Sequence, residues 1–129
     1  MILRKYMSLL GVGSARIDLL LPKTTYKTGE TIYGHFDIKG GTVEQHIKRI
    51  DCDLVKVNHH TGAEEIIDTT SILTSTYIYP EQCSKLSFTF QLPSVMEPST
   101  KEFSYQFKTK LTFSKGIESK DMDLIRIAK

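Results

Sequence analysis

Residues 26–34 of this chain, Tyr-Lys-Thr-Gly-Glu-Thr-Ile-Tyr-Gly, decide its fold class. Gly29 stands where a tight turn requires a positive φ, and Glu30 follows it. From Ile32 onward apolar and polar residues alternate, which is typical of a half-buried β-strand. Gly34 lies inside that strand and predicts the close approach of another backbone or a bulky ring. The stretch therefore predicts a turn that leads into a strand of a packed sheet.

The same alternation recurs along most of the chain. Apolar residues spaced by two form an inward-facing set in four segments: 15–21, 32–38, 86–92 and 103–113. Short strands separated by turns, each with one apolar and one polar face, indicate two antiparallel sheets packed together. We therefore predict an all-β fold, a two-sheet antiparallel β-sandwich over residues 14–129.

The middle of the chain contains two long strand-like stretches. Within 43–57 the inward-facing set changes parity, which predicts a β-bulge or a bend at Lys48-Arg49. Residues 58–62 have turn chemistry and are followed by a second strand-like stretch over 63–79. We expect these two stretches to form a hairpin.

Two prolines bound one loop near the C-terminal end. Pro93 and Pro98 cannot donate a backbone hydrogen bond, so the loop between them is expected to stay outside any strand ladder. The last strand is predicted over residues 124–127, where apolar residues reappear.

Composition places this chain among ordinary globular domains. It has 129 residues, 40% of them hydrophobic and 25% charged. The net charge of +2 is too small to favour nucleic acid as a partner. The spacing of Cys52 and Cys83 fits no zinc or redox motif. We expect two reduced cysteines in a cytoplasmic protein, with Cys52 buried in its strand.

No set of residues in the sequence has the spacing of an active site. The adjacent His59 and His60 have no further ligand at metal-binding spacing. Asp51 and Asp53 share a strand face opposite Cys52, so they are expected to be solvated. Asp121 and Asp123 could form a calcium-ligand pair, but the residues around them lack the other oxygen ligands. We expect no catalytic residue, no cofactor and no metal site.

Residues 1–13 carry the one convincing helical pattern. Their apolar positions follow the i, i+3, i+4, i+7 spacing of a single helical stripe: Leu3, Tyr6, Met7 and Leu10. Such a helix could cap the end of the sandwich, or the stripe could bind a protein partner or a membrane surface. A secretion signal is a weaker reading, because the apolar stretch is short.

Exposed sheet edges are a further route to binding. A strand at an edge has unpaired backbone groups, and a partner or a second copy can add a strand there. Two-fold pairing through an edge would produce a homodimer.

Several segments together resemble a known family. The turn with Tyr26 and Gly29, and the strand that continues to Gly41, are similar to the first half of an arrestin-type N-terminal domain. Residues 90–93, Pro98 and the strand from 103 resemble the second half. Segments 11–18, 40–45 and 121–125 are similar to the bacterial branch, the stage-zero sporulation-control protein M family of bacilli.

The resemblance implies an arrestin-like, cytoplasmic and non-enzymatic scaffold or adaptor that affects sporulation through protein partners. A membrane-peripheral module that binds through its N-terminal stripe is the alternative. We expect these residues to hold only the first of the two sandwiches that members usually carry. The residues that carry the resemblance are structural: Tyr26, Gly29, Glu30, Gly34, Pro93 and Pro98.

Overall fold

The computed structural model describes residues 13–129, and these form eight β-strands. The strands are β1 (Arg16–Leu20), β2 (Thr25–Lys27), β3 (Thr31–Lys39), β4 (Gln45–Asn58), β5 (Glu64–Ile78), β6 (Cys83–Gln91), β7 (Phe103–Phe113) and β8 (Glu118–Ala128). The described part of the chain contains no helix with the length and apolar character needed to cross a bilayer. The apolar stripe of the predicted N-terminal helix lies outside the described residues: Leu3, Tyr6, Met7 and Leu10.

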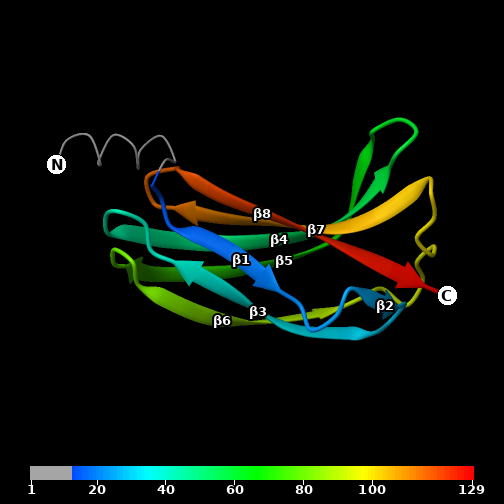
Figure 1. Ribbon diagram of the computed structural model, residues 1–129, viewed down its shortest axis with the longest axis horizontal. Coiled ribbons are helices and arrows are strands. Elements are labelled where there is room, and N and C mark those ends of the chain that lie inside the picture. Colours follow the sequence, from blue (N-terminus) through cyan, green and yellow to red (C-terminus); the bar gives the residue numbers. More distant parts are fainter. Residues whose placement is uncertain (1–12) are drawn as a thin grey trace.

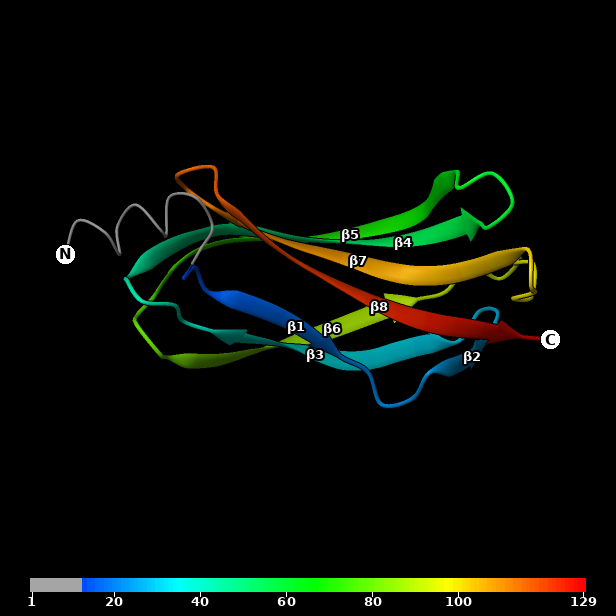
Figure 2. The same ribbon diagram turned by 45° about the horizontal axis from the view of Figure 1, so that its top comes forward.

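The strands form two layers (Figures 1 and 2). The three-stranded sheet has the order β1-β3-β6, and the five-stranded sheet has the order β2-β8-β7-β4-β5. Figure 2 shows β4, β5 and β7 in one layer and β1, β3 and β6 in the other. The predicted all-β fold with two packed sheets is confirmed.

The prediction of purely antiparallel sheets is wrong at one edge. β2 pairs in parallel with β8, with Thr25 opposite Arg126 and Lys27 opposite Ala128. A three-residue strand is too short to show an alternating pattern, so the sequence indicated only a turn there.

The core lies between the inner faces of the two sheets. Phe36 of β3 packs edge-on against Phe88 of β6, with ring centroids 5.2 Å apart. Phe107 of β7 meets Phe88 and Phe90 in the same geometry, at 5.5 and 5.1 Å. Edge-to-face contacts of this kind stabilise a core beyond the area that they bury. The four rings therefore join the two sheets near the centre of the molecule.

The predicted bulge and hairpin are both present. The pairing of β4 with β5 and with β7 shifts register between Ile47 and Arg49. Ile47 and Ile50 are consequently both buried although they are three positions apart. The hairpin closes where the N–H of Asn58 donates to the carbonyl of Ala63 at 2.9 Å.

The last strand is longer than predicted. β8 spans Glu118–Ala128, whereas the sequence indicated only 124–127. Asp121 and Asp123 are opposite Thr109 and Phe107 of β7, at inward-facing positions. Acidic residues at these positions interrupt the apolar alternation, which is why the first half of the strand was missed.

The turn at Gly29 joins the two halves of the family motif. Gly29 has φ +75°. Its N–H donates to the carbonyl of Pro93 at 2.8 Å, and the N–H of Leu92 donates to the carbonyl of Glu30 at 2.9 Å. Tyr26 is buried, and its hydroxyl donates to the carbonyl of Lys23 at 2.8 Å. The predicted turn is confirmed, and its role is to connect two remote segments.

The predictions for Gly34 and for the proline loop are also confirmed. A Cβ on Gly34 would lie 2.5 Å from the carbonyl oxygen of Leu20, so β1 can pass this point only because the side chain is absent. Pro93 and Pro98 lie in the segment 92–102, which contains no strand.

Candidate functional site

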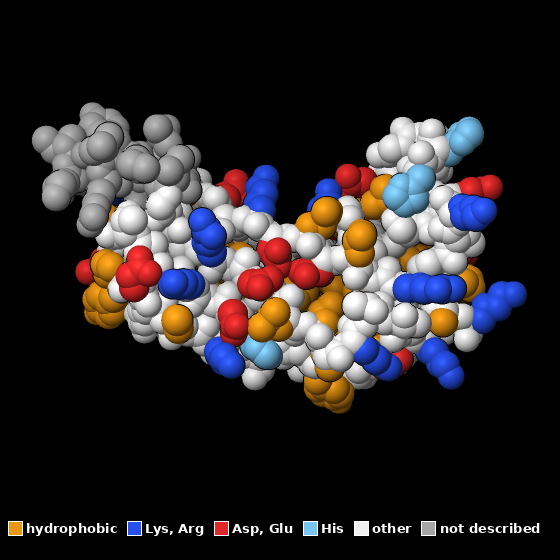
Figure 3. All heavy atoms as spheres, in the orientation of Figure 1, with side chains coloured by type: hydrophobic (Ala, Val, Ile, Leu, Met, Phe, Trp, Pro, Cys, Tyr) orange, Lys and Arg blue, Asp and Glu red, His pale blue; other side chains and the backbone are white. Residues whose placement is uncertain are grey.

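The outer face of the five-stranded sheet, formed by the outward-pointing side chains of β4, β5, β7 and β8, is hollowed. We call it the concave face. The hollow has a volume of about 900 Å³ and is lined by residues of β4, β7 and β8 and the turn between β7 and β8. In Figure 3 the outline dips beside the β4–β5 hairpin tip at the upper right. Strand register places three rows across this face: Ser71–Asp51–Lys110–Lys120, Thr69–Asp53–Lys108–Met122 and Ile66–Val55–Gln106–Leu124.

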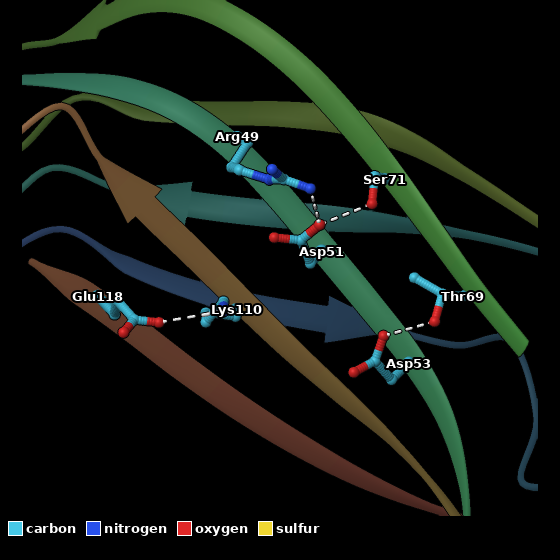
Figure 4. A network of polar contacts seen from close by, with 7 residues as sticks. All are labelled: Arg49, Asp51, Asp53, Thr69, Ser71, Lys110 and Glu118. Carbon is cyan, nitrogen blue, oxygen red and sulfur yellow. Dashed lines mark hydrogen bonds and ion pairs between the residues drawn. The ribbon is translucent and has the colours of Figure 1, made fainter. Parts of the chain in front are cut away.

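Polar contacts order the first of these rows (Figure 4). Arg49 donates to Oδ1 of Asp51 at 2.8 Å, and the hydroxyl of Ser71 donates to the same oxygen at 2.6 Å. Burial raises the pKa of Asp51, but these two hydrogen bonds and nearby positive charges outweigh it and leave the pKa lowered. Lys110 forms an ion pair with Glu118 at 3.4 Å. Asp51 and Lys110 of this row are therefore already paired within the protein.

The row nearest the hairpin tip has three apolar residues and Gln106, which is buried. Leu124 is 64% exposed and Ile66 is 61% exposed, whereas Val55 between them is 2% exposed. Lys108 is opposite Asp53 and Glu64 is opposite Val57, so the ion pair between Lys108 and Glu64 crosses β4 at Val55. This crossing explains why an outward-pointing valine is buried.

The second row adds one more apolar side chain. Met122 of β8 is 57% exposed and lines the hollow. With Leu124, two positions along the same face of β8, it forms a small exposed apolar patch beside charged rows, whereas Ile66 lies on β5, three strands away. A contiguous apolar patch rimmed by polar groups is typical of a binding surface.

A second feature is a cluster of carboxylates between β1 and β8. Oxygen atoms of Asp18, Asp121 and Asp123 lie within 4.8 Å of one another. The N–H of Leu19 donates to Oδ2 of Asp121 at 2.9 Å, across 102 positions of sequence. Oδ2 of Asp123 is buried and receives no hydrogen bond from a described residue.

This crowding changes the acidity of the cluster. Burial, then the hydrogen bond and charge of Asp121 and the charge of Asp18, raise the pKa of Asp123 to about 7. Burial and the carboxylates of Asp121 and Asp37 raise the pKa of Asp18. The cluster is therefore expected to hold a proton near neutral pH. Three carboxylates would supply only part of the six to eight oxygen ligands that Ca²⁺ takes.

Cys52 is not a reactive group. Its thiol is buried, and the hydroxyl of Thr109 donates to it at 3.4 Å. Burial raises the pKa of Cys52 to about 12, so the reactive thiolate is suppressed at neutral pH. Cys83 is exposed at the start of β6.

The structure assembles groups that sequence reasoning treated separately. Asp121 and Asp123 were noted only as a pair, and Asp18 joins them from a remote strand. Asp51 and Asp53 do point outward, as predicted, but both are half-buried and accept hydrogen bonds from neighbouring side chains, so the expectation that they are freely solvated is wrong. The apolar patch was missed, although Met122 and Leu124 alternate with Asp121 and Asp123 and could have indicated an apolar outer face.

Comparison with known proteins assigns the family. The family described as SpoOM protein matches residues 3–129. The chain belongs to this family. The resemblance to the sporulation-control family, carried by segments 11–18, 40–45 and 121–125, is thereby confirmed.

Two comparisons, one of sequence and one of structure, show how far the likeness to a relative from Bacillus subtilis extends. The sporulation-control protein spo0M of Bacillus subtilis (strain 168) is 29% identical over 128 residues, which are 95% of this chain and 50% of that protein. The crystal structure of Spo0M, sporulation control protein, from Bacillus subtilis superimposes with a TM-score of 0.81 at 27% identity. It covers 92% of this chain and 51% of the other. The chain thus spans about half the length of this relative.

Proposed function

We propose that this chain is a non-enzymatic adaptor domain in the control of sporulation, and that it binds another protein through the concave face. The sporulation role is supported by the likeness to the sporulation-control protein spo0M of Bacillus subtilis. The observation that carries the binding role is the patch of Met122 and Leu124 on β8, each more than half exposed on the outer sheet face, with Met122 lining its hollow.

Charge and shape favour a protein as the occupant. The groups beside the patch include both signs, with Arg49 and Lys110 each paired to a carboxylate. A mixed field of this kind does not favour a polyanion such as nucleic acid. Exposed apolar side chains surrounded by polar groups are the usual anatomy of a protein interface. The adaptor is proposed to act in the cytoplasm.

A photo-crosslinking experiment tests this proposal. A photoreactive phenylalanine analogue replaces Met122 on the concave face, and in a control protein it replaces Tyr33, which is 68% exposed on the other sheet. Irradiation in cells of the native host is expected to produce a protein adduct from the first site and not from the second. Leu124→Asp in the same chain should abolish the adduct, because it places a charge in the apolar patch.

The outcomes separate the competing functions. Adducts of equal yield from both sites, or adducts that survive Leu124→Asp, would refute binding at the concave face. Flotation with anionic vesicles tests the membrane-peripheral alternative. Vesicle binding that is lost when Leu3 and Leu10 are changed to aspartate would replace the adaptor with a membrane module.

A further inference from the structure

The sheet edges of this protein are unequal. The five-stranded sheet ends at β2, which has three residues, and at β5, which has fifteen. The three-stranded sheet ends at β1, where Asp121 accepts the Leu19 N–H, and at β6, which carries Lys85. Short length, an edge lysine and an occupied N–H are protections against strand addition. β5 pairs with β4 and with no other strand of residues 13–129.

The composition of β5 leaves this edge open. Residues 69–78 contain no charged residue, no proline and no glycine, and most are β-branched or aromatic. Leu73 is 77% exposed and Tyr77 is 54% exposed. Strands of this composition form ladders readily, and natural edge strands usually carry a charge to prevent it.

Two register shifts limit the part of β5 that can pair regularly with an added strand. β5 shifts register against β4 between Thr76 and Leu73, and again between Asp68 and Ile66. Bulges twist an edge away from a partner, so the regular part of β5 is the segment 68–73. Because this regular segment is short, few registers are available to an added strand.

We propose that two copies of this chain pair through the free edges of β5, in antiparallel orientation, with the two-fold axis at Ser71. Thr69 then lies opposite Leu73 of the second copy, and the same pair recurs on the other side of the axis. Thr70 lies opposite Ile72 in the same way. Residues directly opposite in a sheet must share a face, and a two-fold axis perpendicular to the sheet satisfies this only when one residue is opposite its own copy.

The acidic residues of β5 would lie far apart in an antiparallel dimer of two copies. Glu64, Glu65 and Asp68 stand on one side of the axis in each chain, so antiparallel pairing places the two acidic groups at opposite ends of the ladder. Leu73, the most exposed large apolar residue of the strand, gains a neighbour. A threonine opposite an aliphatic residue is a favourable cross-strand pair. The pairing is independent of any partner at the concave face.

Cysteine crosslinking tests both the dimer and its register. In a Cys83→Ser background, mild oxidation of Ser71→Cys is expected to produce a disulfide-linked dimer, because the two Cβ atoms would lie about 5 Å apart. Thr69→Cys and Leu73→Cys are the matched controls. Each alone should stay monomeric, because its own copy lies about 14 Å away along the strand. A mixture of the two variants should crosslink.

Sedimentation equilibrium of the unmodified chain provides the second measurement. The interface is small, so we expect a dimer that grows with concentration up to about 0.5 mM. Ser71→Lys places two ammonium groups opposite each other and should weaken the dimer by at least about tenfold. Ser87→Lys, an equivalent change on exposed β6, should leave it unchanged.

Each of three results would overturn the proposal. The chain could remain monomeric at about 0.5 mM, Leu73→Cys could crosslink to itself more readily than Ser71→Cys, or both lysine variants could weaken the dimer equally. Thermal melting of every variant verifies that it is folded, so that a lost dimer is not a lost fold.

Discussion

Replacing Asp123 with asparagine should stabilise this protein at alkaline pH and leave it unchanged in acid. Asp123 lies with Asp18 and Asp121 between β1 and β8, and its pKa is raised from 3.8 to about 7. The folded state therefore retains a proton that the unfolded state releases between about pH 4 and pH 7. Because the unfolded state binds fewer protons there, the free energy of unfolding falls as pH rises through this window.

The size of the effect follows from the shift. A change of this size corresponds to about 4 kcal/mol for a fully buried group. Asp123 is partly exposed, so solvent screening reduces the contribution to about 2 kcal/mol. Asp123→Asn keeps the shape of the side chain and removes the charge. At pH 8 it should raise the melting temperature by about 6–8 °C, and near pH 4 the two proteins should melt together.

Urea unfolding from pH 4 to pH 8 measures this difference. Asp51→Asn is a matched control whose effect on the free energy of unfolding has the opposite sign, because the pKa of Asp51 is lowered in the folded state. That variant should be less stable than the wild type by a nearly constant amount from pH 8 to pH 4, because the pKa of Asp51 lies below this range in both the folded and the unfolded state. Parallel stability curves for the wild type and Asp123→Asn would show that the cluster does not hold a proton, and the reasoning from crowding would fail.

Two further predictions concern close packing and thiol reactivity. Gly34→Val should lower the free energy of unfolding by about 3 kcal/mol, since a Cβ there meets a backbone oxygen at 2.5 Å. The control Thr89→Val, at an exposed position of β6, should change the free energy of unfolding by less than about 0.5 kcal/mol. Equal urea midpoints for the two variants would contradict the packing argument. In the folded protein a maleimide should modify Cys83 and spare Cys52 until urea unfolds the chain. Intact-mass analysis counts the labels, and two rapid modifications of native protein would refute the burial of Cys52.

Much of the fold was predictable because the alternation of apolar and polar residues along a strand shows which of its faces is buried. Because side chains alternate between two faces, the residues of β3 and β7 that face the core can be identified from the sequence alone. The parity change at Lys48-Arg49 located the bulge by the same rule. The turn at Gly29 was predictable because few residues other than glycine adopt its φ of +75°.

Other features depend on which strands become neighbours. β2 is a strand only because β8 passes beside it, and the first half of β8 carries acids where an isolated pattern would need apolar residues. Val55 points outward and is still buried, at the point where the ion pair of Lys108 and Glu64 crosses β4.

The sequence by itself determined the strands, their inward faces, the bulge and the turns, since each depends on residues within a few positions of one another. The tertiary structure alone decided the carboxylate cluster, the hollow of the concave face and the open edge at β5. Asp18 and Asp121 approach each other because the folded sheets place β1 beside β8. Proximity between remote strands is set by the packing of the whole chain, and no local pattern encodes it.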